Sequence, residues 1–113
     1  MKGFAFAALV TVAFTAGCGS SALPPAKFTD TKAAISAAEA VGAPNSPQGA
    51  LHLKLAKDQL KNAEALIEED EHEQARLVLE RARADAELAR LITEREQEQL
   101  QANQAMERVR ELE

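Results

Sequence analysis

The chain has 113 residues and a formal net charge of −5, and 24 of its residues are Ala, nearly half of the apolar total. It has no Trp or Tyr, and its four Phe all lie in the first 28 residues, although substrate pockets are usually lined by aromatic and bulky apolar side chains. This composition argues against a sizeable globular enzyme, and the acidic balance argues against nucleic acid as a partner.

The first 17 residues are typical of a secretory signal peptide. Met1 and Lys2 provide a basic start, and an uncharged apolar run follows as far as Gly17. The run is too short to cross a bilayer core of about 30 Å, which needs roughly 20 residues. We therefore expect cleavage between Gly17 and Cys18.

Ala16, Gly17 and Cys18 resemble the lipobox of bacterial lipoproteins, with Thr15 where Leu is usual. The resemblance implies that Cys18 carries lipid. Two or more acyl chains would anchor the protein firmly, whereas a single chain binds a membrane only marginally. In Gram-negative lipoproteins an Asp directly after this Cys favours retention in the inner membrane. Gly19 stands there instead, which implies that the protein is in the outer membrane and faces the periplasm. The alternative is that Cys18 is a buried or free thiol, and as the only Cys it excludes an intramolecular disulfide.

Residues 18–28 form a predicted tether, and residues 29–113 form an Ala-rich helical domain. The tether contains Pro24-Pro25, which favours an extended course. Without residues 1–17 the chain has 12 basic and 18 acidic residues, a net charge of −6. The first predicted helix covers about 30–41, with Thr29 as N-cap. Its apolar face consists of Ala34, Ile35, Ala38 and Val41.

The second predicted helix covers about 47–69. Ser46 is its expected N-cap, and Pro47 stands at the first helical position, where the missing N–H costs nothing. An apolar stripe follows at alternating spacings of three and four residues: Leu53, Ala56, Leu60, Ala63 and Ile67.

The third predicted helix covers about 71–113. Acidic residues cluster from Glu68 to Glu73, and acids favour a helix N-terminus over a C-terminus. Asp70 and Glu73 also fit a capping box, so we expect a tight turn near 69–70. No Gly or Pro marks this break, and a single helix over 47–113 is the alternative.

An apolar seam follows the third helix in an unbroken 4-3 register from residue 77 to residue 112. A second apolar face from residue 75 to residue 89 indicates that this part packs between neighbours. Arg95 and Glu98 interrupt the seam, so the segment beyond Thr93 is either exposed or a coiled coil with a weak middle. The predicted interaction seam consists of Leu77, Ala84, Leu88, Leu91, Ala102, Ala105, Val109 and Leu112.

These segments predict an all-α fold, with a short helix, a long antiparallel helical hairpin and an extended C-terminal helix or coiled coil. Their order resembles small bacterial lipoproteins of the family called domain of unknown function 4398, over about residues 18–92. The segments that carry the resemblance are Ile35–Ala43, Pro47, Leu51–Leu60, Glu73–Arg76 and Arg81–Ala89. The family's usual Gly-Asp or Gly-Asn turn with a following aromatic is replaced here by residues 69–72.

The resemblance implies no catalytic residue. Some members carry a peptidoglycan-binding domain downstream, and we do not expect that role to carry over to this chain. The chain ends Arg110-Glu111-Leu112-Glu113, so we expect no covalent peptidoglycan link of the Braun type, which uses a C-terminal Lys.

The sequence contains no recognisable catalytic, cofactor or metal motif. His72 lies among acids but has no second His in register, and the acids lack the spacing of a calcium loop. A solvated, helix-capping cluster is the simpler interpretation. We therefore expect no catalytic residue, no metal ligand and no cofactor apart from the lipid on Cys18.

The sequence favours a lipid-anchored, non-enzymatic envelope protein that acts as a structural or tethering module. Its expected partners are the membrane and a like or unlike helix that contacts the seam. The alternatives are a periplasmic carrier or chaperone-like module that binds an apolar ligand or segment, and an accessory subunit of a transport or secretion assembly.

Overall fold

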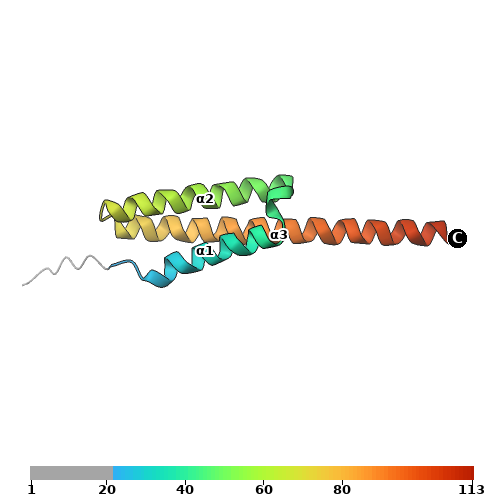
Figure 1. Ribbon diagram of the computed structural model, residues 1–113, viewed down its shortest axis with the longest axis horizontal. Helices are drawn as coiled ribbons and strands as arrows, with labels where there is room; N and C mark the ends of the chain where they lie inside the picture. Colours follow the sequence, from blue (N-terminus) through green and yellow to red (C-terminus); the bar gives the residue numbers. More distant parts are fainter. Residues whose placement is uncertain (1–21) are drawn as a thin grey trace, which may run out of the picture.

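The computed structural model describes residues 22–113 and contains three α-helices and one short 3₁₀ turn in that range. The helices are α1 (Pro25–Ala40), α2 (Pro47–Glu68) and α3 (His72–Glu111), and η1 (Ala43–Asn45) lies between α1 and α2 (Figure 1). The predicted all-α class and the helical hairpin of α2 and α3 are confirmed. The predicted signal peptide, the cleavage site and Cys18 lie outside the described residues.

Helix α1 begins earlier than predicted. Its N-cap is Pro24, and Pro25 occupies the first helical position, where proline's fixed φ suits a helix. Thr29, the predicted N-cap, lies inside the helix and donates from Oγ1 to the Pro25 carbonyl at 3.2 Å. The predicted tether over 18–28 was therefore too long, because its last residues belong to α1.

The start of α2 matches the prediction. The Ser46 Oγ accepts a hydrogen bond from the Gly49 N–H at 2.9 Å, and Pro47 follows the cap. The chain reaches this point through Gly42, whose φ of 90° lies in the left-handed region that glycine tolerates.

A Schellman turn separates α2 from α3, so the alternative of one continuous helix is wrong. Asp70 has a φ of 60°, the Glu71 N–H donates to the Leu66 carbonyl at 2.8 Å, and the Asp70 N–H donates to that of Ile67 at 3.2 Å. The predicted capping box is also wrong. Asp70 serves as the left-handed residue that closes α2, and the N-cap of α3 is Glu71, which makes no side-chain capping bond.

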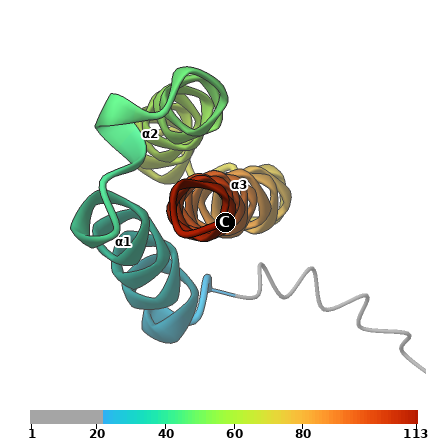
Figure 2. The same cartoon turned by 90° about the vertical axis from the view of Figure 1, so that its right-hand side faces the viewer.

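Helices α1 and α2 pack on one side of the first half of α3, as the end view shows (Figure 2). The core between them is built of small side chains with a few larger ones. Ala38, Ala56, Ala86 and Ala89 are fully buried beside Ile35 and Leu53. Methyl-sized side chains let the helix backbones approach closely.

Helix α2 comes close to α3 at Gly49. A Cβ on this glycine would overlap the Thr93 hydroxyl and lie 2.8 Å from the Ser46 Oγ. Thr93 itself is buried and donates to the Ala89 carbonyl at 2.8 Å. The α2 N-terminus therefore rests on α3 at a position that only glycine fits.

The second half of α3 extends beyond both other helices (Figure 1). Helix α3 has 40 residues, which corresponds to about 60 Å. Every residue from 97 to 113 is exposed. No helix in residues 22–113 combines the length and apolarity that crossing a membrane requires.

Candidate interaction surface

Helix α3 has two apolar faces, and the chain covers only one of them. The covered face consists of Ala75, Leu79, Ala82, Ala86, Ala89 and Thr93. It coincides with the second face identified in the sequence rather than with the seam. This part of α3 does pack between two neighbours, α1 and α2, as expected, but both contact the buried face and the seam is left uncovered.

All eight residues of the predicted seam are exposed. At about 100° per residue they lie roughly opposite the buried face of α3. The exposed fractions are 53% for Leu91, 56% for Val109 and 86% for Leu112. The seam residues therefore form one uncovered stripe along α3, on the side away from its buried face.

Met106 also belongs to this surface, although the sequence analysis did not include it. It is 57% exposed, and together with Ala105, Val109 and Arg110 it lines an open hollow on the protruding half of α3. Met106 lies one position outside the strict 4-3 register. The sequence could have identified it as a large apolar residue next to the seam position Ala105, where it widens the stripe.

The two polar residues at the centre of the seam, Arg95 and Glu98, are exposed. Among the described residues neither of them takes part in an ion pair, whereas neighbouring charges on α3 are paired along the helix. Arg83 contacts Glu87 at 2.8 Å, and Arg90 contacts Glu94 at 2.8 Å. The hydrogen bond with Glu87 raises the pKa of Arg83. The centre of the seam therefore holds two opposite charges without partners among residues 22–113.

A polar cluster joins α2 to α3 away from the seam. Asp85 accepts from the Gln59 Nε2 at 2.9 Å, and its other oxygen lies 3.1 Å from the His52 Nδ1. The cluster fixes how the two helices sit against each other. Residues 22–113 contain no group of three His, Cys, Asp or Glu side chains arranged to hold a metal ion.

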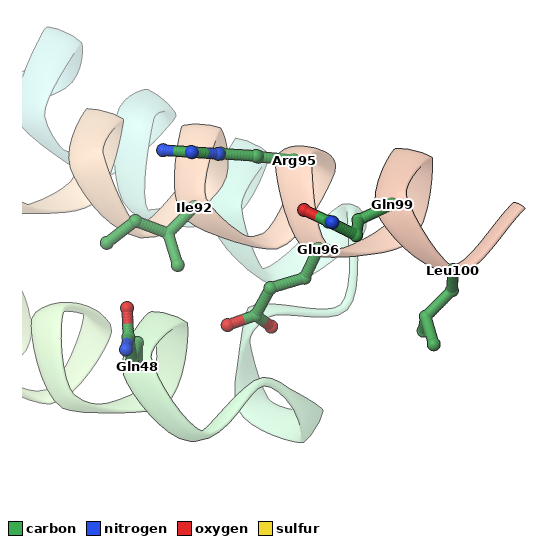
Figure 3. Close-up of a pocket in the computed structure, with 6 residues that line it drawn as sticks. All are labelled: Gln48, Ile92, Arg95, Glu96, Gln99 and Leu100. Carbon is green, nitrogen blue, oxygen red and sulfur yellow. The ribbon is translucent and has the colours of Figure 1, made fainter. Parts of the chain in front are cut away.

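A groove of about 500 Å³ lies beside the start of α2. Figure 3 shows the side chains that line it: Gln48, Ile92, Arg95, Glu96, Gln99 and Leu100. Glu96 extends toward α2, whereas Arg95 lies along the opposite edge of α3 (Figure 3). Four of the six lining side chains are charged or amides.

Comparisons with known proteins place the chain in one family. No curated protein and no solved structure matches it. The family model described as "Domain of unknown function (DUF4398)" matches residues 26–105, which include α1, α2 and most of α3. The chain belongs to the DUF4398 family.

Proposed function

We propose that this chain is a lipid-anchored, non-enzymatic envelope protein that tethers or scaffolds other proteins through the seam on α3. Lipid on Cys18 would hold it in the outer membrane on the periplasmic side. No cofactor beyond this lipid has a role in the proposal. The observation that carries it is the exposed stripe of large apolar side chains along a helix that protrudes from its own bundle.

The exposure of this stripe supports a protein-interaction role. Soluble monomers rarely expose a contiguous apolar patch of more than a few hundred Å², and larger patches mark interaction sites. The seam includes Leu77, Leu88 and Leu91 beside the bundle, and Val109 and Leu112 near the tip. A helical partner with its own apolar stripe would cover it along its whole length.

The membrane anchor is supported by the sequence before α1. An apolar run behind Lys2 leads to Ala16-Gly17-Cys18. α1 begins at Pro25, so only residues 19–24 would separate the lipid from the bundle. At roughly 3.5 Å per extended residue this connection spans about 20 Å. The bundle would therefore stay close to the membrane surface.

Metabolic labelling with a palmitate analogue tests the anchor. We expect the full chain to incorporate label and to fractionate with outer membranes, and Cys18→Ala to lose both. Ser20→Ala is the matched control, and it should be labelled like the wild type. Equal labelling of Cys18→Ala and wild type would refute the lipid anchor.

A photocrosslinking amino acid tests the interaction surface in cells. Placed at Leu91 or Val109, it should yield a discrete crosslinked product. Placed at Lys61, an exposed position on α2, it should not. Equal crosslinking from all three positions, or none from the two seam positions, would refute the proposed role of the seam.

A further inference from the structure

The seam has a charge pattern that identifies its partner. Read as heptads, its a positions are residues 81, 88, 95, 102 and 109, and its d positions are 77, 84, 91, 98, 105 and 112. Arg95 and Glu98 occupy adjacent a and d positions, midway between the apolar segments 84–91 and 102–109. A covering helix must supply an acid opposite Arg95 and a base opposite Glu98.

We propose that a second copy of this chain covers the seam, with the two α3 helices antiparallel and a two-fold axis between residues 96 and 97. In this register Arg95 of each copy faces Glu98 of the other, so both of these charges are neutralised. The inference rests on the proposed function of the seam as an interaction surface and names the partner as this chain itself.

The same register pairs large side chains with small ones. Leu91 lies opposite Ala102 of the second copy, and Leu88 lies opposite Ala105. Ala84 then lies opposite Val109, while the aliphatic stem of Arg81 lies against Leu112. A large side chain opposite a methyl fills the space between two helices without crowding them.

The flanking positions agree with the register as well. In an antiparallel pair the g positions of the two helices meet, which places Glu87 against Arg108 of the second copy. The other g pair, Glu94 with Gln101, brings no like charges together. A parallel pair in register would instead set Arg95 against Arg95 and Glu98 against Glu98, which repel each other.

The shape of the chain fits this arrangement. The exposed half of α3, residues 97–113, would lie along the uncovered seam of the other copy's bundle. The hollow lined by Ala105, Met106 and Val109 lies where Leu88 of the second copy would insert. The overlap from 81 to 112 extends over about 45 Å. Because the contact is isologous, the assembly closes at two copies.

Cysteine crosslinking in membranes from cells tests the register in the full chain. Two differently tagged copies are expressed together, one with Leu91→Cys and the other with Ala102→Cys. Mild oxidation should join the two tags in one product. Leu91→Cys with Val109→Cys is the matched control, because it uses the same face displaced by one heptad and should not crosslink. Wild type, which retains Cys18, gives the background.

Charge reversal tests the paired interruption. Arg95→Glu alone and Glu98→Arg alone should each reduce the yield of the 91–102 crosslink at least about threefold. Each substitution places two like charges opposite each other at both of the 95–98 contacts that the two-fold axis relates. The double variant Arg95→Glu/Glu98→Arg should restore the yield, because each copy again faces an opposite charge. A double variant that crosslinks no better than the single variants would overturn the proposed pairing.

The outcomes separate this inference from the proposed function. Self-crosslinking of every single-Cys variant would indicate a parallel pair and would overturn the antiparallel register. A photocrosslink from Leu91 to a different protein, without a 91–102 product, would overturn self-pairing and leave the seam as an interaction surface. Absence of both products would refute the inference and the proposed surface together.

Discussion

Gly49 shows how a single residue sets the spacing of two helices. In an exposed helical position Ala is more stable than Gly by about 1 kcal/mol. Here an added Cβ would overlap the Thr93 hydroxyl and crowd the Ser46 cap. We predict that Gly49→Ala lowers the free energy of unfolding by about 1–3 kcal/mol, measured by urea denaturation followed by circular dichroism.

Two further variants test the cause of this effect. Gln48→Ala changes an exposed neighbour and should alter stability little. In a Thr93→Ala background, Gly49→Ala should cost less than in the wild type, because one of its two overlaps is gone. A Gly49→Ala variant more stable than the wild type would show that the helices are not in close contact at this point.

Asp70 is the residue where α2 turns into α3, and its backbone is strained. Its φ of 60° costs an L-residue roughly 1–2 kcal/mol, whereas Gly adopts it freely. Its side chain is 94% exposed, so little is lost by removing it. We predict that Asp70→Gly raises the thermal midpoint, while Glu69→Gly, at a φ of −88°, lowers it. A lower midpoint for Asp70→Gly would contradict the Schellman geometry.

At the scale of elements, exposed ion pairs attach α1 to α3. The Lys27 Nζ lies 3.2 Å from the Glu80 carboxylate, which Arg76 also contacts at 2.9 Å. The hydrogen bond from Lys27 holds the pKa of Glu80 below its usual 4.5, and the hydrogen bond with Arg76 lowers that of Glu73. These carboxylates therefore favour the folded state while they are ionised.

This arrangement predicts the direction of the pH dependence. A carboxyl whose pKa is lower when folded contributes stability above pH 4.5, and that contribution is lost as pH falls through the folded value. The free energy of unfolding should decline on acidification below pH 4.5, and Glu80→Gln should reduce the steepness of the decline. Glu113→Gln, near the exposed C-terminus, is the control. Identical pH profiles for Glu80→Gln and wild type would contradict the role of this pair.

Much of the element pattern could be predicted from the sequence, because it follows from local rules. Ser46 and Pro47 specify the start of α2, and the stripe from Leu53 to Ile67 specifies its inner face. The start of α1 was misjudged, because the two prolines are compatible with both an extended tether and a first helical turn. The turn at Asp70 lacks a glycine, so its left-handed backbone could be seen only in the structure.

The sequence identified both apolar faces of α3 but not which one lies inside. Both have helical periodicity, and periodicity alone carries no information about which face the neighbours will cover. The structure selects the Ala-rich face because its small side chains allow α1 and α2 to pack closely on one helix. The Leu-rich seam is left outside. The close contact of Gly49 with Thr93 fixes this orientation of α3, and such a tertiary contact cannot be seen in the sequence pattern of a single helix.

At the scale of the whole molecule, the protruding half of α3 has little support from its own bundle beyond the hydrogen bond from the Gln97 Nε2 to the Val41 carbonyl. In proteins most helical stability comes from packing of an apolar face against a neighbour, so the exposed residues 97–113 depend on a partner helix for full stability. In the proposed dimer they lie on the second copy. The arrangement places the two α1 N-termini at opposite ends of the assembly, about 70 Å apart.

Oligomerisation and helicity should therefore change together. We predict that Leu91→Glu, which buries a charge opposite Ala102, dissociates the dimer and lowers the helical content of residues 97–113. Lys61→Glu, an exposed charge change on α2, should affect neither. The measurements are circular dichroism and hydrogen exchange of the detergent-solubilised full chain. A monomeric Leu91→Glu variant with undiminished exchange protection beyond residue 97 would contradict the dependence of this segment on pairing.

The most direct test of the central claim is the molar mass of the detergent-solubilised full chain, measured by sedimentation equilibrium over a dilution series. The account predicts a dimer that dissociates on dilution, and a Leu91→Glu variant that stays monomeric throughout. A wild-type chain that is monomeric at every concentration, with residues 97–113 fully helical, would contradict it.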